Sequence, residues 1–284
     1  TVVSAFAQMF DFEPHLDIIR RIPGLTWTPG IPERFRGKTM EELKSMLMSV
    51  PRVPQTIQRA RYIATAPASV DWPVQNPACV NVVRDQGNCG SCWAFSAIAE
   101  FSDRRCIAGK DATRVQYSEQ YVVSCDTIDQ GCNGGYLGMV WRFLGKTGTV
   151  PESCVAYKSG KSGQTGTCPT KCDNGSALPA ATKSTGYKDV ATSVESIMSA
   201  VAEGPVTTGF TVYLDFEMYT GGIYKHTYGS QMGGHAVEIV GYGEENGVKF
   251  WKVKNSWSST WGEKGYFRIV RGTNECGIED QCIA

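Results

Sequence analysis

The spacing of apolar residues changes along the chain from a helical to a strand-like period. Between Thr39 and Val50, apolar residues recur at intervals of three and four, which is the spacing of one helix face. Thr39, followed three residues later by Glu42, has the pattern of a helix capping box. A second apolar stretch of helical period begins at Cys92 and continues towards Cys106. The pattern therefore predicts one helix near the N-terminus and another that begins at Cys92.

The region after Gly186 favours strands. Its runs of β-branched and aromatic residues are Val206–Val212, Ala236–Tyr242, Phe250–Val253 and Tyr266–Val270. Asn246-Gly247, between the second and third runs, is a strong hairpin signal. Residues 155–185 are rich in Gly, Ser, Thr and Lys, which predicts extended loops. We therefore expect an α+β protein with a helical first half and a β-rich second half.

The first 65 residues differ in composition from the rest. They contain no cysteine, and they end in a basic, breaker-rich stretch with Pro51, Pro54, Arg59 and Arg61, as expected of a linker open to proteolysis. Residues 1–7 have the composition of a trimmed signal peptide's tail, but they equally fit an arbitrary starting point. We predict three units: an N-terminal segment over residues 1–65, a helical lobe over 66–180 and a β-rich lobe over 181–284.

Charge and cysteine content narrow the class of protein. Lys plus Arg and Asp plus Glu both number 28, so charge gives no reason to expect a nucleic-acid partner. No run of 18 apolar residues is present, so we expect no membrane span. Eleven cysteines are many for a cytosolic protein, and an odd number leaves at least one thiol outside intramolecular bridges. A secreted or vesicular protein with one working thiol would account for them.

The stretch Cys89-Gly90-Ser91-Cys92-Trp93 is the most specific motif in the chain. Cys92 begins the predicted helix, whose N-terminal partial positive charge favours a thiolate, the nucleophilic form of cysteine. Cys89-x-x-Cys92 alone also fits a redox pair or half of a zinc site. A second C-x-x-C pattern is absent from the sequence, which weakens the zinc interpretation.

A candidate base lies far downstream of Cys92. Of the three histidines, His235 follows two glycines and precedes a predicted strand, about 140 residues after Cys92. Asn255 follows, just before Ser256-Trp257. Taken alone, His235 also fits a hydrogen-bonded core histidine, and Asn255 a turn residue.

The pentapeptide around Cys92, with His235 and Asn255 downstream, resembles the signature of papain-family cysteine peptidases. Residues 131–136, 232–236 and 276–279 are similar to cathepsin B in particular. The resemblance implies a two-lobed papain-like fold, with Cys92 on a helical lobe, His235 and Asn255 on a β-barrel lobe, and a cleft between them. It implies acyl transfer by Cys92, with His235 as acid and base and Asn255 as its orienting partner. No metal or organic cofactor is required.

Further site residues follow from the same resemblance. Gln86 corresponds to the residue whose amide stabilises the oxyanion, together with the backbone N–H of Cys92. The residues implied in substrate binding are Gly134, Gly135, Gly234, Trp257 and Gln281. Gln281 stands where cathepsin B has a glutamate that admits arginine, which predicts weaker selectivity for basic residues. An alignment slip would put Glu279 or Asp280 there instead.

The interval between Cys154 and Cys168 is short and contains no histidine. Cathepsin B has an occluding loop with two histidines that hold a substrate's C-terminal carboxylate. We therefore expect that loop to be missing and the enzyme to be an endopeptidase. The sequon Asn174-Gly175-Ser176 is a candidate glycosylation site, although a plain loop explains the same residues.

The resemblance also implies cysteine pairs and a role for the N-terminal segment. The implied pairs are Cys79–Cys106, Cys89–Cys132, Cys125–Cys168 and Cys154–Cys172. Cys276 and Cys282 are close enough in sequence to bridge, but this pair departs from the family pattern and stays open. Residues 1–65 resemble an inhibitory pro-segment anchored by Trp27 and Phe35, with a disordered tail as the alternative. Acid should loosen it and allow cleavage between about Val50 and Pro67.

The sequence thus predicts a zymogen, acting on protein and peptide substrates, that is monomeric and has its own pro-segment as inhibitor. A lysosome-like compartment, a secretory vesicle or secretion would suit it. The alternatives are a related thiol acyltransferase, such as a peptide ligase, and a non-catalytic binding protein on the same scaffold.

Overall fold

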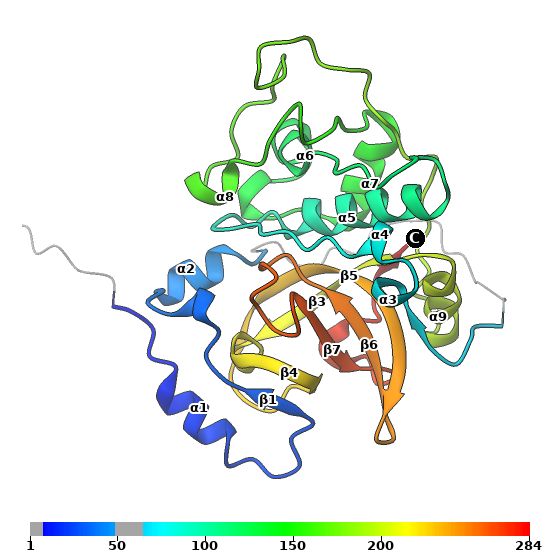
Figure 1. Cartoon of the computed structure of the whole chain (residues 1–284). Coiled ribbons are helices and arrows are strands. Elements are labelled where there is room, and N and C mark those ends of the chain that lie inside the picture. Colours follow the sequence, from blue (N-terminus) through cyan, green and yellow to red (C-terminus); the bar gives the residue numbers. More distant parts are fainter. Residues whose placement is uncertain (1–7, 49–64) are drawn as a thin grey trace, which may run out of the picture.

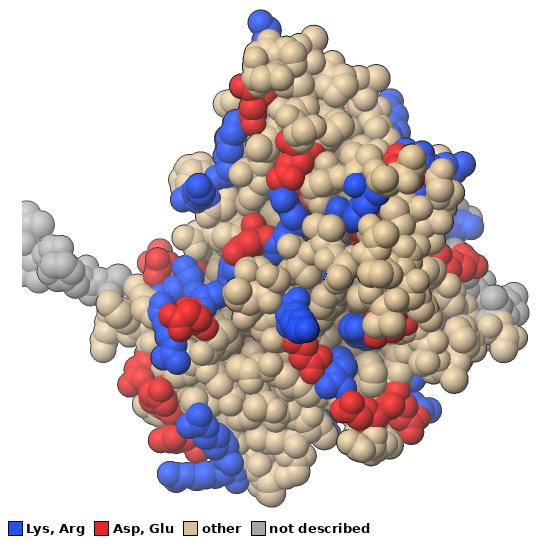
Figure 2. All heavy atoms as spheres, viewed as in Figure 1, with Lys and Arg blue, Asp and Glu red and all other residues tan. Residues whose placement is uncertain are grey.

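The computed structural model describes residues 8–48 and 65–284, which form a helical lobe, a β-rich lobe and an N-terminal segment along the β-rich lobe (Figure 1). The expected linker residues Pro51, Pro54, Arg59 and Arg61 lie outside the described residues, as do residues 1–7. Lys, Arg, Asp and Glu are intermixed on the face in Figure 2, in keeping with the formal net charge of zero.

The helical lobe is built around α5, which runs over Cys92–Ile107 and begins where the apolar period predicts. Its side chains pack with those of α6 and α7 in one core that includes Trp93, Ile98, Val122 and Trp141. The other helices in residues 66–180 are α3 (Trp72–Gln75), α4 (Pro77–Val80), α6 (Glu119–Cys125), η2 (Gly131–Asn133), α7 (Leu137–Lys146) and α8 (Ser159–Ser162). The core thereby fixes the start of α5, where the candidate nucleophile lies.

Disulfides tie the loops of this lobe to its helices. All four pairs implied by the resemblance are present: Cys79–Cys106, Cys89–Cys132, Cys125–Cys168 and Cys154–Cys172. The suggested bridge between Cys276 and Cys282 is not formed, and both residues are thiols. Cys282 Sγ instead donates to the carbonyl oxygen of Ile278 at 3.5 Å.

The β-rich lobe is an eight-stranded sheet. Its strands are β1 (Trp27–Pro29), β2 (Val70–Asp71), β3 (Val206–Tyr213), β4 (Tyr219–Tyr224), β5 (Gln231–Glu245), β6 (Val248–Lys254), β7 (Tyr266–Val270) and β8 (Cys282–Ile283). They are ordered β1-β4-β7-β6-β5-β3-β8, with β2 beside β5. All pairs are antiparallel except β4 with β7. Asn246 and Gly247 both have positive φ in the predicted hairpin turn between β5 and β6.

The region after Gly186, expected to be strand-like, also contains a helix that was not expected, α9, which covers Val194–Glu203. Ser193 caps this helix by accepting a hydrogen bond from the backbone N–H of Ser196. Ile197 and Val201 are buried on one face of α9. The short 3₁₀ helices η3 (Leu214–Met218) and η4 (Glu275–Gly277) also interrupt the strands.

The N-terminal segment is ordered from residue 8 to residue 48, contrary to the alternative of a disordered tail. It contains α1 (Glu13–Ile19), β1, η1 (Glu33–Phe35) and α2 (Met40–Ser45). The predicted capping box of Thr39 and Glu42 is formed. The helix ends at Ser45, because Met48 pairs with Gly234 of β5. Val50, the end of the expected helix, lies outside the described residues.

Two aromatic side chains anchor this segment, as expected. Trp27 is buried and packs on Tyr224, with ring centroids 5.4 Å apart. Phe35 is completely buried and meets Trp257 edge-on at 5.4 Å. Burying two large aromatic side chains stabilises the docked segment by several kcal/mol, about 2–3 each.

A buried ionic cluster joins the two lobes beside the site. Lys254, at the end of β6, binds Asp103 of α5 and Glu238 of β5, the latter at 2.9 Å. Arg114 pairs with the same Asp103 at 2.6 Å. Breaking such a buried set leaves an uncompensated charge, which is strongly destabilising. The cluster therefore holds Asn255, the residue after Lys254, at a set distance from α5.

Candidate active site

Cys92 is the first residue of α5 and is completely buried. Burial raises the pKa of its thiol to about 12, while backbone N–H groups of Ala236, Trp93 and Cys92 itself oppose the shift. Ala236 lies in β5, directly after His235. The sulfur is therefore next to the strand that carries the candidate base, and it stays protonated while the site is covered.

His235 lies within β5, paired with Phe210 of β3. Its Nε2 is 2.8 Å from Oδ1 of Asn255, and its ring stacks on Trp257 at 4.7 Å. Burial lowers the pKa of His235 to about 4; the Asn255 hydrogen bond opposes this shift and Arg34 adds to it. Nδ1 has no hydrogen-bond partner within the described residues. Asn255 thus holds Nε2 and leaves Nδ1 available for another partner.

Gln86 is completely buried, and both the nitrogen and the oxygen of its side-chain amide form hydrogen bonds. Its Nε2 donates to the carbonyl oxygens of Met46 and Cys89, each at 2.8 Å, and its Oε1 accepts from Ser256 Oγ at 2.7 Å. The backbone N–H of Gln86 donates to the carbonyl oxygen of Ser256 at 2.9 Å. The amide therefore points its N–H groups at main-chain oxygens near the thiol, as an oxyanion donor would.

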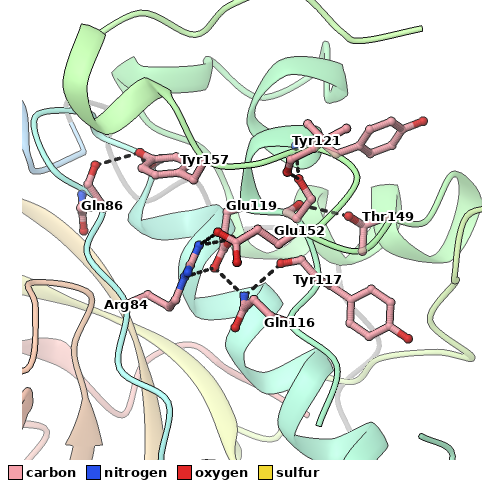
Figure 3. A network of polar contacts seen from close by, with 12 residues as sticks. Arg84, Gln86, Gln116, Tyr117, Glu119, Tyr121, Thr149, Glu152 and Tyr157 are labelled. Atoms are coloured by element: carbon pink, nitrogen blue, oxygen red, sulfur yellow. Dashed lines mark hydrogen bonds and ion pairs between the residues drawn. The ribbon is translucent and has the colours of Figure 1, made fainter. Parts of the chain in front are cut away.

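Tyr157 supports both Gln86 and the start of α5. Its hydroxyl donates to the carbonyl oxygen of Gln86 at 2.8 Å (Figure 3). The same hydroxyl lies 2.8 Å from Ser91 Oγ. Phe95 packs edge-on against the Tyr157 ring at 4.7 Å. No sequence pattern singled out Tyr157, because its partners are remote in sequence and one of them is a main-chain carbonyl.

A charged network fixes the chain just before Gln86. Arg84 pairs with Glu119 at 3.3 Å and with Glu152, and Gln116 donates to Glu119 at 2.9 Å (Figure 3). Burial raises the pKa of Glu119 to about 7, and Arg84 opposes that shift. The loop that carries Gln86 is thus tied to α6 of the helical lobe by Arg84 and to Tyr157 by its own carbonyl.

The residues expected to bind substrate differ in their packing and backbone contacts. Gly135 is closely packed, since a Cβ there would lie 2.5 Å from the Trp93 ring. Gly134 has a φ of 121°, which favours glycine. Gly234 exchanges backbone hydrogen bonds with Met48, at 2.8 and 3.3 Å. Trp257 lies against His235, as described above.

Gln281 is half-buried near the C-terminus, and its carbonyl oxygen accepts from Thr208 Oγ1 at 3.0 Å. Glu279, one of the two residues that an alignment slip would put there, forms hydrogen bonds elsewhere: its carboxylate accepts from Trp251 Nε1 at 2.9 Å and from the Gly272 N–H at 2.6 Å.

The N-terminal segment covers the site. Met46 gives its carbonyl oxygen to Gln86, and Leu47 packs against Gly233, where a Cβ would lie 2.9 Å from that of Leu47. Met48 then pairs with Gly234. Residues 46–48 therefore occupy the donors and the strand edge that a peptide substrate would need.

Neither a metal site nor a membrane-spanning helix is found in the part of the chain that the structure describes. Within residues 8–48 and 65–284, no group of three or more His, Cys, Asp or Glu side chains could hold a metal ion. None of the helices in this described part is long and apolar enough to cross a membrane.

Known proteins are similar to this chain in sequence and in fold. Residues 66–284 match the family described as "Papain family cysteine protease". The chain is 54% identical over 263 residues to Cathepsin B-like CP3 of Giardia intestinalis, covering 90% of this chain and 88% of that protein. It is 50% identical over 269 residues to Cathepsin B-like CP2 of the same organism, covering 91% and 88%.

The fold is similar to that of proCathepsin B S9 from Trypanosoma congolense, with a TM-score of 0.88, 28% identity and coverage of 96% of this chain and 97% of that one. The chain belongs to the papain family of cysteine proteases. Within that family it is cathepsin B-like, and the expected α+β papain-like fold is confirmed. Its disulfides and its cathepsin B-like sequence indicate the secretory pathway.

Proposed function

We propose that this chain is the precursor of a cysteine endopeptidase in which Cys92 is the nucleophile, His235 the acid and base, and Asn255 the partner that orients His235. The observation that carries the proposal is the bond of His235 Nε2 to Asn255 Oδ1 at 2.8 Å, next to a thiol at the first residue of a sixteen-residue helix. We also propose the division into residues 1–65, 66–180 and 181–284. The family match, which begins at residue 66, supports the first boundary.

The chemistry follows from these positions. The Cys92 thiolate attacks the peptide carbonyl, and the oxyanion that forms accepts hydrogen bonds from Gln86 Nε2 and the Cys92 backbone N–H. Imidazolium at His235 gives its proton to the leaving amine as the C–N bond breaks. Water, deprotonated by His235, then hydrolyses the thioester and restores the thiol. Gly134, Gly135 and Gly234 would hold the substrate backbone on the acyl side, as an extended chain paired with exposed main chain.

Residues 8–48 act in this proposal as an inhibitory pro-segment. In the covered form the thiol and the imidazole are both neutral, since burial raises the pKa of Cys92 to about 12 and lowers that of His235 to about 4. Uncovering the site hydrates both groups and allows a thiolate–imidazolium pair to form. Latency then results from protonation state as well as from steric blockage.

This gives a prediction on pH dependence. We expect the full-length chain to react with iodoacetamide at Cys92 at least about 100-fold more slowly at pH 6 than the chain without residues 1–65, because only the uncovered thiol is ionised there. With a covered pKa of about 12, the slow reaction should accelerate as pH rises. The measurement is mass spectrometry of the Cys92 peptide against time. Equal rates for the two chains at pH 6 would show that the segment does not protect the thiol.

Acid remains the proposed trigger of release. Arg34 of the segment forms an ion pair with Asp85 at 2.8 Å. Burial raises the pKa of Glu217, beneath the segment, to about 8, with Arg34 opposing the shift. A carboxyl whose pKa is higher in the covered form favours that form as pH falls, so Glu217 opposes acid release. The expected cleavage region before Pro67 lies largely outside the described residues.

The absence of an occluding loop is part of the proposal. The chain between Cys154 and Cys168 is short, and its α8 is held at its start by Gln120, whose Oε1 accepts from the backbone N–H groups of Lys158 and Ser159 at 2.8 and 2.9 Å. This stretch contains no histidine. It therefore lacks the two histidines that hold a substrate's terminal carboxylate in cathepsin B. Gln281, in place of a carboxylate, should leave aliphatic or aromatic residues preferred over arginine.

A substrate experiment tests this function. We expect the activated chain to cleave a peptide blocked at both ends as fast as the same peptide with a free C-terminus. We further expect it to prefer leucine to arginine at the second position before the cleaved bond. Product mapping by mass spectrometry measures both quantities. Dominant release of C-terminal dipeptides would contradict the missing loop, and strong preference for arginine would contradict the role of Gln281.

The same experiment separates the rival functions. Products joined to an added amine nucleophile in preference to hydrolysis would identify a ligase. No cleavage of any peptide after removal of residues 1–65 would favour a binding scaffold. A lysosome-like compartment, a secretory vesicle or the outside of the cell remains the proposed location, with the protein acting as a monomer.

A further inference from the structure

Glu217 is a buried carboxylic acid for which the proposed mechanism has no use. It lies in η3, its side chain is completely buried, and neither carboxyl oxygen has a hydrogen-bond partner within the described residues. Burying a carboxylate without a partner is costly, so such a group is rare unless something compensates it. Burial raises its pKa to about 8, and Arg34 is the charged group that opposes this shift.

Arg34 belongs to the pro-segment and is itself incompletely satisfied. Its Nη1 pairs with Asp85 Oδ1 at 2.8 Å, its Nη2 meets Met46 Sδ at 3.4 Å, and its Nε has no partner in the described part of the chain. The guanidinium also lowers the pKa of His235. The Arg34 guanidinium therefore acts electrostatically on the buried carboxyl of Glu217, the exposed carboxylate of Asp85 and the imidazole of His235.

The pro-segment itself shows which side of the site this is. From Met46, at Gln86, the chain continues through Leu47 to Met48, which pairs with Gly234 on the proposed acyl side. Arg34, which precedes Met46 in the chain, contacts the Met46 sulfur. Its neighbour Phe35 packs on Trp257, which in turn lies 5.8 Å from Phe216, the residue before Glu217. Asp85 forms a backbone bridge with Trp257, and Glu217 follows Phe216 in η3, so we assign both carboxyl groups to the side on which the leaving group departs.

We infer that Asp85 and Glu217 form an acidic subsite on the leaving-group side, which takes an arginine or lysine side chain of the substrate and beside which Arg34, paired with Asp85, lies in the precursor. The inference rests on the proposed peptidase function. Removal of residues 8–48 takes away Arg34, the ion-pair partner of Asp85, and the segment that binds η3 through Gly30, so that Asp85 and Glu217 both become available to a substrate cation. Opposite charges on enzyme and substrate then select among peptides, and a like charge is repelled.

The test uses the activated chain and doubly blocked peptides that share one acyl side. They differ only in the first or second residue after the cleaved bond, which is arginine, its neutral isostere citrulline, or glutamate. We expect kcat/KM for arginine to exceed that for glutamate by about fivefold or more at one of the two positions, with citrulline between them. In Glu217→Gln the ratio should fall towards one, while Glu244→Gln, at an exposed carboxylate of the β5 hairpin, should keep the wild-type ratio.

Each outcome decides something. A wild-type chain that cleaves the arginine, citrulline and glutamate peptides equally well would overturn the subsite and leave the peptidase function standing. A chain that cleaves none of them would remove the proposed function and the subsite with it. A wild-type preference that survives in Glu217→Gln would exclude Glu217 as its source. If Glu217→Gln does not fold, the wild-type comparison of arginine with citrulline still decides whether a positive charge is selected.

Discussion

Replacement of Cys92 by alanine is expected to lower kcat/KM for peptide hydrolysis by about 10⁴-fold or more after removal of residues 1–65. Nucleophile removal in a triad enzyme has effects of this order, because the remaining groups only bind and polarise the substrate. The alanine side chain fits the space of the buried thiol at the start of α5, so the fold should be retained. Initial rates on a quenched fluorogenic peptide, with intact disulfides as a check on folding, measure the loss.

The matched control is another thiol. Cys276 lies in η4 and is half-buried, and Cys276→Ala is expected to keep labelling of Cys92 by an epoxide thiol probe. Labelling of the wild type should appear only when residues 1–65 are removed, and it should disappear in Cys92→Ala. Hydrolysis by Cys92→Ala within about tenfold of the wild-type rate would mean that another group attacks the substrate.

The parts of the site that depend on short sequence patterns could be predicted. The pentapeptide around Cys92 marks the start of α5, and the resemblance it carries identified His235, Asn255, Gln86 and all four disulfides present in the described residues. Their roles in catalysis stay predictions. The resemblance could identify these residues together because the family motif includes residues from both lobes.

The parts that depend on tertiary contacts could not be predicted. Tyr157 acts through its hydroxyl on the main-chain carbonyl of Gln86, and any residue type offers such a carbonyl. In the sequence Glu217 looks like a surface acid, and its complete burial becomes visible only in the folded structure. The helix α9 was missed because the β-rich runs around it dominated the interpretation, although Ser193 begins it as a regular cap. Met48, within a predicted helix, is extended because pairing with Gly234 outweighs helix propensity.

The second large effect is expected at Gln86. Gln86→Ala should reduce kcat of the activated chain by about 10²–10³-fold, with a small change in KM, because the lost N–H donor acts on charge that develops in the transition state. Gln86→Glu keeps an acceptor for Ser256 Oγ but directs a negative charge at the oxyanion, so it should be at least as damaging. Tyr157→Phe, which only removes the hydroxyl that holds the Gln86 carbonyl, should cost about tenfold or less.

The same variant should act on the precursor in the opposite sense. In the covered form Gln86 Nε2 donates to the carbonyl oxygen of Met46 at 2.8 Å, a hydrogen bond worth about 0.5–1.5 kcal/mol. Gln86→Ala should therefore make the full-length chain open more often, and alkylation of its Cys92 should become about 2–10-fold faster, while its hydrolytic activity falls. A kcat within about tenfold of wild type would remove Gln86 from the oxyanion site. If the faster alkylation were still seen, Gln86 would remain only as the residue that holds the pro-segment in place.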